Sequence, residues 1–438
     1  MTTTAEVRLW GTTIGAVTSP DGDPYASFEY EPGFRQSGIQ VSPLMMPLSS
    51  EVFRFPELSV RSFHGLPGLL SDSIPDKFGN ALIDVWLAGQ GRTPESFNAV
   101  ERLCYTGTRG MGALEFRPVL SGSPDYNERL HIDALADLAS KIIQNREKLA
   151  APLHPEDETK EAKALAQIIQ VGTSAGGARA KAVIAWNPQT NEIRSGQLQT
   201  DKGFEYWLIK FDGVKGNGDK ELADPSGYGQ IEYAYYRMAQ QAGIEMSECR
   251  LLEENGRRHF ITKRFDRTPG GGKIHMQTLG ALAHYDFNQA GAYSYEQVFG
   301  IMDRIGLDRS AGIQFFKRMA FNILAANNDD HVKNISFLMD RTGRWSLAPA
   351  YDITFSWNPG GLWTGMHQMS MNGKREHFTA EDFYECGKAA FLKRAQVQDI
   401  LAEVREAVAQ WPSFAEHSGI DAERMQAVQT VLTGLTVT

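Results

Sequence analysis

The most informative part of the sequence is Ala325-Ala326-Asn327-Asn328-Asp329-Asp330-His331-Val332-Lys333-Asn334, at the end of a predicted apolar helix over residues 311–326. Apolar side chains at three-to-four spacing predict that helix. Polar and charged side chains then replace them within a few positions. A stretch of this composition is most often the solvated loop after a helix, so composition alone does not identify a site here.

One spacing within this segment is more specific. Asp329 and Asn334 are separated by four residues, as in the catalytic loop D-x-x-x-x-N of protein kinases. In that loop the aspartate accepts a hydrogen bond from the acceptor hydroxyl and the asparagine holds Mg²⁺. Asp330 has the wrong spacing, so we predict Asp329 as the catalytic base and Asn334 as a metal ligand. By itself the pattern is common.

A second acidic residue follows at the end of a strand-like run, Leu347-Ala348-Pro349-Ala350-Tyr351-Asp352-Ile353. Mg²⁺ prefers oxygen ligands and often binds through one or two carboxylates together with phosphate oxygens. We therefore predict Asp352 as the second metal ligand. The alternative is a turn aspartate that caps the segment after it.

Lys210 ends another apolar strand, Tyr206-Trp207-Leu208-Ile209-Lys210. A lysine there either extends its ammonium group to solvent or meets an anion. Kinases use such a lysine to bind phosphate oxygens and hold it with a glutamate from a helix. Glu232, at the start of the next predicted helix, is the candidate partner. The alternative for Glu232 is simple compensation of the helix dipole.

A run of small residues, Gly172-Thr173-Ser174-Ala175-Gly176-Gly177-Ala178-Arg179-Ala180-Lys181, precedes a strand-like segment. Small residues allow backbone N–H groups to approach phosphates closely. The run is not a Walker A motif, because Ala178 and Arg179 stand where Lys and Ser/Thr are required. Taken alone, it would be a flexible loop.

The order of these elements carries more weight than any one of them. A glycine-rich loop, a strand lysine, a helix glutamate, a D-x-x-x-x-N segment and a strand-end aspartate follow one another as in kinases. We predict an α+β, two-lobed protein-kinase-like fold with a β-rich N-terminal part and an all-helical C-terminal lobe. The expected units are a β-rich N-terminal subdomain over residues 1–125, an N-lobe over 126–268 and a helical C-lobe over 269–438. The main expected elements are strands over residues 7–10, 26–30, 112–119, 182–186, 206–211 and 259–265, and helices over residues 74–88, 131–149, 232–242, 295–305, 311–326, 380–389, 397–411 and 422–435.

Composition limits the alternatives. The 438 residues carry 44 Lys and Arg against 53 Asp and Glu, a net charge of −9, which argues against broad electrostatic binding of nucleic acid. Three scattered cysteines do not suggest a disulfide framework. Uncharged apolar runs of about 18 residues are absent from the sequence, so we expect a soluble, cytoplasmic protein without membrane contact.

The segments NNDDHVKN (327–334), LAPAYDI (347–353), TSAGGARAK (173–181) and KRFDR (263–267) together resemble the HipA-like serine/threonine kinases of bacterial toxin–antitoxin systems. Residues 66–73 and 107–112 are similar to the N-terminal subdomain of that family. The resemblance extends over most of the chain.

The resemblance implies a role for each matching residue. Asp329 would be the base, Asn334 and Asp352 would hold Mg²⁺, Lys210 would contact the phosphates, and Ser174 would be the autophosphorylated serine of the loop. The remaining residues implied to bind ATP are Gly176, Gly177, Ala178, Arg179, Ala180 and Lys181 over the triphosphate, Lys263, Arg264 and Phe265 at the adenine hinge, and His331, Lys333 and Tyr351 lining the site.

Two positions depart from the family pattern. Lys263 stands where an acidic residue is usual, and Thr173 adjoins Ser174 as a second hydroxyl that could accept the phosphate. The implied partners are a small helix-turn-helix antitoxin, through which DNA is bound only indirectly, and a protein of translation such as an aminoacyl-tRNA synthetase. Two other readings stay open: a catalytically silent nucleotide-binding co-repressor and a small-molecule kinase.

Overall fold

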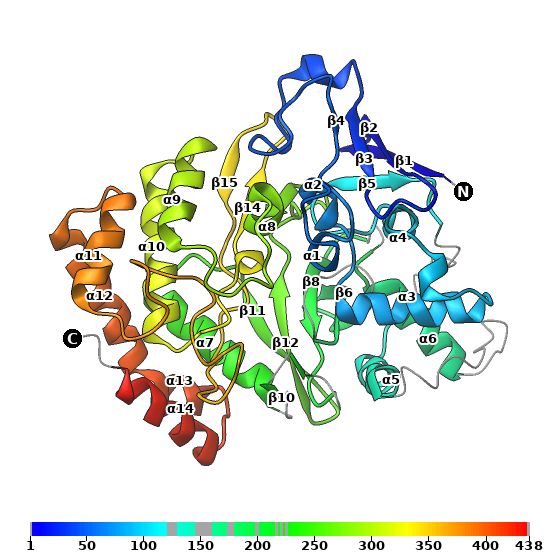
Figure 1. The fold of residues 1–438 in the computed structure, drawn as a ribbon. Coiled ribbons are helices and arrows are strands. Elements are labelled where there is room, and N and C mark those ends of the chain that lie inside the picture. The colour runs from blue at the N-terminus through cyan, green and yellow to red at the C-terminus, as the bar shows by residue number, and fades with distance from the viewer. Residues whose placement is uncertain are drawn as a thin grey trace.

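The computed structural model describes residues 2–120, 129–144, 160–172, 179–197, 201–214, 218–219, 222–223 and 227–435. Figure 1 shows a β-rich N-terminal part at the upper right, a central sheet, and a group of C-terminal helices at the left. The predicted α+β architecture, with a β-rich N-terminal part and a helical C-terminal region, is confirmed.

The N-terminal sheet has the strand order β4-β3-β2-β1-β5 and is antiparallel throughout. The strands expected near residues 7–10, 26–30 and 112–119 are present. Alternating apolar side chains of β1 are buried, and a tight turn at Trp10 and Gly11, both with positive φ, leads into β2. The strands are β1 (Thr3–Leu9), β2 (Thr12–Ser19), β3 (Ser27–Tyr30), β4 (Val52–Phe53) and β5 (Leu114–Arg117).

Four helices lie between β4 and β5 in the chain: α1 (Val60–Phe63), α2 (Gly68–Ser71), α3 (Lys77–Gly89) and α4 (Ala99–Thr106). The helix expected from residue 74 begins instead at Lys77. Asp76 is its N-cap and accepts hydrogen bonds from the backbone N–H groups of Phe78 and Gly79. The cap therefore fixes the start of α3 more strongly than the apolar pattern does.

The central sheet has the order β11-β12-β8-β6-β7 and is also antiparallel. One side of the sheet packs against α3, α5 (Ile132–Gln144) and α6 (Lys160–Gly172) in a shared core. Helix α6 was not predicted from the sequence. The other side is covered by α7 (Tyr228–Gln241), which contacts β11 and β12. The strands are β6 (Lys181–Asn187), β7 (Glu192–Ser195), β8 (Glu205–Lys210), β11 (Cys249–Glu254) and β12 (Arg257–Lys263), and a small ribbon is formed by β9 (Gly218–Asp219) and β10 (Leu222–Ala223).

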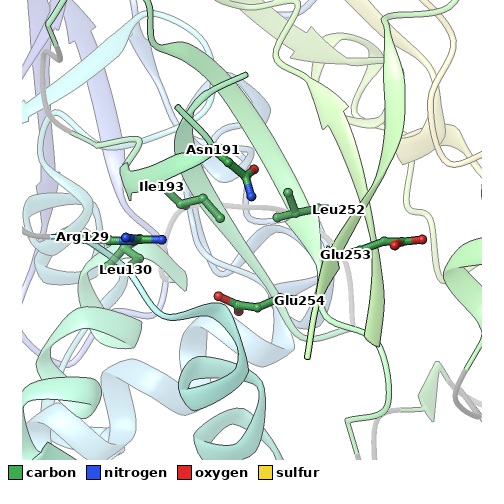
Figure 2. Close-up of a pocket in the computed structure, with 7 residues that line it drawn as sticks. All are labelled: Arg129, Leu130, Asn191, Ile193, Leu252, Glu253 and Glu254. Carbon is green, nitrogen blue, oxygen red and sulfur yellow. The ribbon is translucent and has the colours of Figure 1, made fainter. Parts of the chain in front are cut away.

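Residues 130–133 are hydrogen-bonded to both edge strands of the central sheet, β7 and β11. The backbone N–H of Leu130 donates to the carbonyl of Ile193 in β7, and the N–H of Asp133 donates to Glu254 in β11. Figure 2 shows the small cavity between these edges, to which Leu252 also contributes. Its volume of about 40 Å³ is far below the several hundred Å³ of a typical ligand pocket. The cavity is therefore a packing gap between the edge strands and residues 129–130.

The C-terminal part is helical but also contains a three-stranded antiparallel sheet, so the expectation of a lobe made only of helices was too simple. Its strands are β13 (His275–Thr278), β14 (Ser336–Met339) and β15 (Trp345–Leu347), which are three or four residues long and too short to give a clear periodic signal. The helices are α8 (Leu279–Ala283), α9 (Tyr295–Arg304), α10 (Arg309–Leu324), α11 (Ala380–Ala389), α12 (Arg394–Ala409), α13 (Trp411–His417) and α14 (Ala422–Gly434). Among the described residues, none of the helices has the length and apolar character needed to cross a membrane.

A buried ionic cluster joins the N-terminal part to the segment that follows β12. Asp266 is fully buried and accepts hydrogen bonds from Arg264, Arg267 and the backbone N–H of Gly112. Both arginines also donate to the carbonyl of Gly110. Burial alone would raise the pKa of Asp266, but the two guanidinium groups outweigh it and lower the pKa well below the usual range.

We predict that Asp266→Asn lowers the free energy of unfolding by about 3–5 kcal/mol, because it leaves two buried guanidinium groups without their shared carboxylate. Urea denaturation followed by circular dichroism measures the change. Asp23→Asn, in the exposed pair with Arg54, is the matched control and should unfold like the wild type. A stability of Asp266→Asn equal to that of this control would contradict the importance of the cluster.

Candidate active site

The central feature of the site is the ammonium group of Lys210, at the end of β8. Its Nζ lies 2.5 Å from Oε1 of Glu232 and also contacts Oδ1 of Asp352. The Lys210 side chain is only 13% exposed and that of Glu232 only 3% exposed. A lysine from the sheet, a glutamate from α7 and an aspartate that follows β15 thus meet at one point.

Glu232 does not open its helix as the sequence suggested. Helix α7 begins at Tyr228, its first turn contains no acidic residue, and Glu232 is buried one turn further on. Compensation of the helix dipole acts within the first turn. The burial and position of Glu232 are therefore explained by the contact with Lys210 rather than by the dipole.

The charges of Lys210 and Asp352 stabilise each other. Burial alone would lower the pKa of Lys210, but the carboxylates of Asp352 and Glu232 outweigh it and raise that pKa. Burial likewise would raise the pKa of Asp352, but Lys210 and Lys181 hold it well below its usual range. Lys210 and Asp352 are therefore both charged at neutral pH.

Asp352 follows a tyrosine that is hydrogen-bonded to the segment that contains Asp329. Asp352 has a φ of 52°, in the left-handed region that aspartate tolerates better than most residues. The hydroxyl of the preceding Tyr351 donates to the carbonyl of Lys333 at 2.6 Å. Tyr351 and Lys333 therefore link the two segments directly. Asp352 and Asn334 are the residues that follow them in the chain.

The segment with kinase-like spacing forms a tight loop after α10. The side-chain amide nitrogen of Asn334 donates to the backbone carbonyl of Asp329 at 2.8 Å. This bond closes the loop and leaves the amide oxygen of Asn334 as a potential ligand. The Asp329 carboxylate lies 3.8 Å from Nε2 of His331 and accepts a 2.7 Å hydrogen bond from Nε1 of Trp363.

Asp330, the neighbour of Asp329, has a structural role. Its carboxylate is buried and accepts hydrogen bonds from the Tyr295 hydroxyl and the backbone N–H of Gln368, and it lies 3.0 Å from Nδ1 of His367. Trp363, His367 and Gln368 were all missed by the sequence analysis. Only their contacts with the Asp329 segment distinguish them, since neither spacing nor composition marks them.

The side chains expected at the adenine hinge have partners of their own. Lys263 contacts Glu205 at 2.5 Å, and Arg264 is directed into the cluster around Asp266. The Phe265 ring lies 5.6 Å from that of Tyr351. A nucleotide here would thus be contacted mainly by the hinge backbone and by these two rings.

Lys333, also expected to line the site, places its ammonium group 4.6 Å from the Phe287 ring centroid.

Only the two ends of the glycine-rich segment belong to the described residues, namely Gly172 at the end of α6 and residues 179–181. Thr173, Ser174, Gly176, Gly177 and Ala178 lie outside them. Arg179 and Ala180 lie just before β6, and Lys181 is its first residue. The Arg179 guanidinium lies 3.9 Å from the Tyr228 ring centroid, and Ala180 is buried. The Nζ of Lys181 lies 3.9 Å from the carboxylate of Asp76 in the N-terminal part. Lys181 pairs with Lys210 in the sheet register, so both lysines belong to the same part of the sheet.

The two residues expected to hold Mg²⁺ carry oxygen ligands, which Mg²⁺ prefers, but they are few in number. Within the described part of the chain, no three His, Cys, Asp or Glu side chains gather as a metal cluster. Asn334 and Asp352 would supply one amide oxygen and one carboxylate. Mg²⁺ commonly takes one or two carboxylates and completes its shell with phosphate and water oxygens. The pair therefore fits a cation that arrives with a nucleotide rather than one held by protein alone.

The fold and this arrangement define a two-lobed, kinase-like protein with an additional N-terminal sheet. A solved structure with a similar fold is that of Shewanella oneidensis HipA in complex with HipB and its operator DNA, with a TM-score of 0.66, 16% identity, and coverage of 98% of this chain and 95% of that one. Two family models match the sequence: the HipA N-terminal domain over residues 5–117 and the HipA-like C-terminal domain over residues 173–411. The protein belongs to the HipA family.

Among curated proteins, similar sequences include "Putative kinase Y4dM" of Sinorhizobium fredii, 27% identical over 182 residues, and a "Putative kinase" of Haemophilus influenzae, 29% identical over 160 residues. These matches cover 37% and 33% of this chain. They cover 43% and 47% of the relatives, so the chain matches less than half of the length of either.

The charge cluster at Lys210 leads to a prediction on pH. The folded-state pKa of Asp352 lies below its ordinary value of 3.8, so its stabilising contribution is complete above about pH 4 and is lost as the pH falls toward the folded-state pKa. Asp352→Asn removes the charge but keeps a residue that tolerates positive φ. We expect the difference in unfolding free energy between wild type and Asp352→Asn to be constant from pH 5 to 7 and to shrink below pH 4.

Urea titrations at each pH measure this difference. Glu253→Gln, on β11 in an exposed pair with Arg258 of β12, is the control and should give only a small difference over the same range. A difference for Asp352→Asn that grows as the pH falls would mean that the carboxylate is not stabilised in its ionised form.

Proposed function

We propose that this protein is an ATP- and Mg²⁺-dependent serine/threonine protein kinase. The observation that carries the proposal is the buried ammonium group of Lys210 between Glu232 and Asp352. A lysine held by a helix glutamate beside a metal-binding aspartate is the arrangement that kinases use on nucleotide phosphates. The D-x-x-x-x-N loop, which Tyr351 links to the segment of Asp352, would supply a carboxylate for the acceptor hydroxyl, which a protein that only binds nucleotide would not need.

The proposed mechanism is positioning combined with electrostatic stabilisation. Lys210 would bind the phosphate oxygens and would be kept in place by Glu232. Magnesium held by Asn334 and Asp352 would supply further neutralisation of phosphate charge. Asp329 would accept the hydrogen bond of a serine or threonine hydroxyl and orient its oxygen toward the terminal phosphorus.

We also propose a cellular context from the family. The chain would act as the toxin of a cytoplasmic toxin–antitoxin pair, with a protein of translation such as an aminoacyl-tRNA synthetase as target. Its partner would be a small helix-turn-helix antitoxin, as the structure of Shewanella oneidensis HipA with HipB and operator DNA suggests. The net charge of −9 favours contact with DNA through that partner rather than directly.

We predict that Asp329→Asn lowers phosphate transfer at least about 100-fold, the usual scale for loss of a general base. ATP binding should stay within about two-fold of wild type, because the carboxylate of Asp329 acts on the acceptor and the Lys210 cluster is unchanged. Transfer is measured with γ-labelled ATP in a cell extract, followed by separation of proteins from metabolites, and binding by calorimetry. Glu385→Gln, in an exposed pair on α11, is the control and should behave like wild type.

The same experiment separates the competing functions. Label in protein supports a protein kinase, label in metabolites alone supports a small-molecule kinase, and ATP binding with no labelled product supports a silent co-repressor. Unchanged transfer by Asp329→Asn would remove the proposed base.

We further propose that Ser174, or the adjacent Thr173, is autophosphorylated and that this modification silences the enzyme. The support is the sequence of the glycine-rich segment and the family resemblance. We expect mass spectrometry after incubation with ATP to find phosphate on one of these hydroxyls. Ser174→Ala should then stay active for longer than wild type, with Thr173→Ala as the matched variant. Phosphate found only at other positions would contradict this regulation.

A further inference from the structure

Trp363 is the side chain whose contact with the proposed base the sequence did not predict. Its indole Nε1 donates a 2.7 Å hydrogen bond to Oδ1 of Asp329. The ring is half-buried, and its centroid lies 6.3 Å from that of His331, whose Nε2 is itself 3.8 Å from the same carboxylate oxygen. The indole therefore forms part of the wall beside Asp329.

The segment around Trp363 is attached to the catalytic loop at successive residues. The carbonyl of Thr364 accepts a 3.0 Å hydrogen bond from the side chain of Asn328, and the backbone N–H of Gln368 donates to Asp330 at 2.6 Å. Thr364 and Gln368 are each 4% exposed. Residues 328, 329 and 330 thus each bind the segment over residues 363–368.

These attachments decide between two roles for the indole. A removable plug over the acceptor site would need a segment that can leave without breaking buried hydrogen bonds. Here, displacement of Trp363 would disturb the bonds at Thr364 and Gln368, and a buried polar group left without a partner is unfavourable. The arrangement suits a fixed support for the carboxylate better than a gate.

We propose that Trp363 is a positioning residue that holds the Asp329 carboxylate in the orientation needed for the acceptor hydroxyl. This inference rests on the proposed function of Asp329. The terminal torsion of an aspartate side chain is broad, so an isolated carboxylate would sample several orientations. A hydrogen bond from a fixed indole selects one of them before the substrate arrives.

The test uses Trp363→Phe, which keeps an aromatic ring but removes the N–H donor. We expect the kcat for phosphate transfer to fall roughly ten-fold or more, since small misplacements of a catalytic group are costly. The KM for ATP should remain unchanged, because Lys210 and its partners lie on other segments. Leu362→Ala, at the neighbouring position whose side chain is 96% exposed, is the control and should keep the wild-type kcat. A kcat for Trp363→Phe that equals or exceeds that of wild type would overturn the proposal, the second case indicating a gate.

A measurement without turnover separates this inference from the proposed function. The sequence has eight tryptophans, and Trp363→Phe identifies the indole N–H signal of Trp363 in a ¹⁵N–¹H NMR spectrum. We expect Asp329→Ala to shift that signal strongly upfield, because the hydrogen bond is lost. An active wild type whose signal does not respond would overturn the positioning role alone. A wild type without any phosphate transfer would overturn the kinase proposal and the positioning role together.

Discussion

The structure of the site depends on one buried ammonium group. An unpaired charge in the interior costs several kcal/mol, so the buried ammonium group of Lys210 requires carboxylates beside it in the folded protein. Glu232 is 22 positions away along the chain and Asp352 is 142 positions away. The contact therefore requires that β8, α7 and the segment after β15 all reach one point, and it joins the central sheet to the C-terminal lobe.

The N-terminal part is integrated into this arrangement. Asp266 links the segment after β12 to the Gly110–Gly112 turn through Arg264 and Arg267. Asp76, the cap of α3, lies 3.9 Å from Lys181 at the start of β6. Helix α3 also shares its core with the central sheet. The first 120 residues therefore contact the segment after β12 and the start of β6, both of which contain residues of the proposed nucleotide site.

Two adjacent aspartates show how environment separates chemical roles. Asp330 is enclosed by donors from α9 and from the 367–368 segment, and its bonds stabilise the fold. Asp329 faces His331 and Trp363 instead and keeps a position beside the site. Because the two residues are identical in type, only their surroundings distinguish them. The contacts of Asp330 indicate a structural role, whereas those of Asp329 are compatible with the proposed role as a base.

The sequence alone predicted the class of fold and the order of the main elements from local periodicity, and it offered Glu232 as the candidate partner of Lys210 from the order of the motifs. The structure confirmed that contact. The sequence misplaced the start of α3 and the position of Glu232 in α7, because caps and neighbouring strands fix helix boundaries. The short strands β13, β14 and β15 carry too few residues for a periodic pattern. The contacts of Trp363, the enclosure of Asp330 and the cluster around Asp266 were decided only by the tertiary structure, because each joins residues that are far apart in the chain and pair only when packing brings them together.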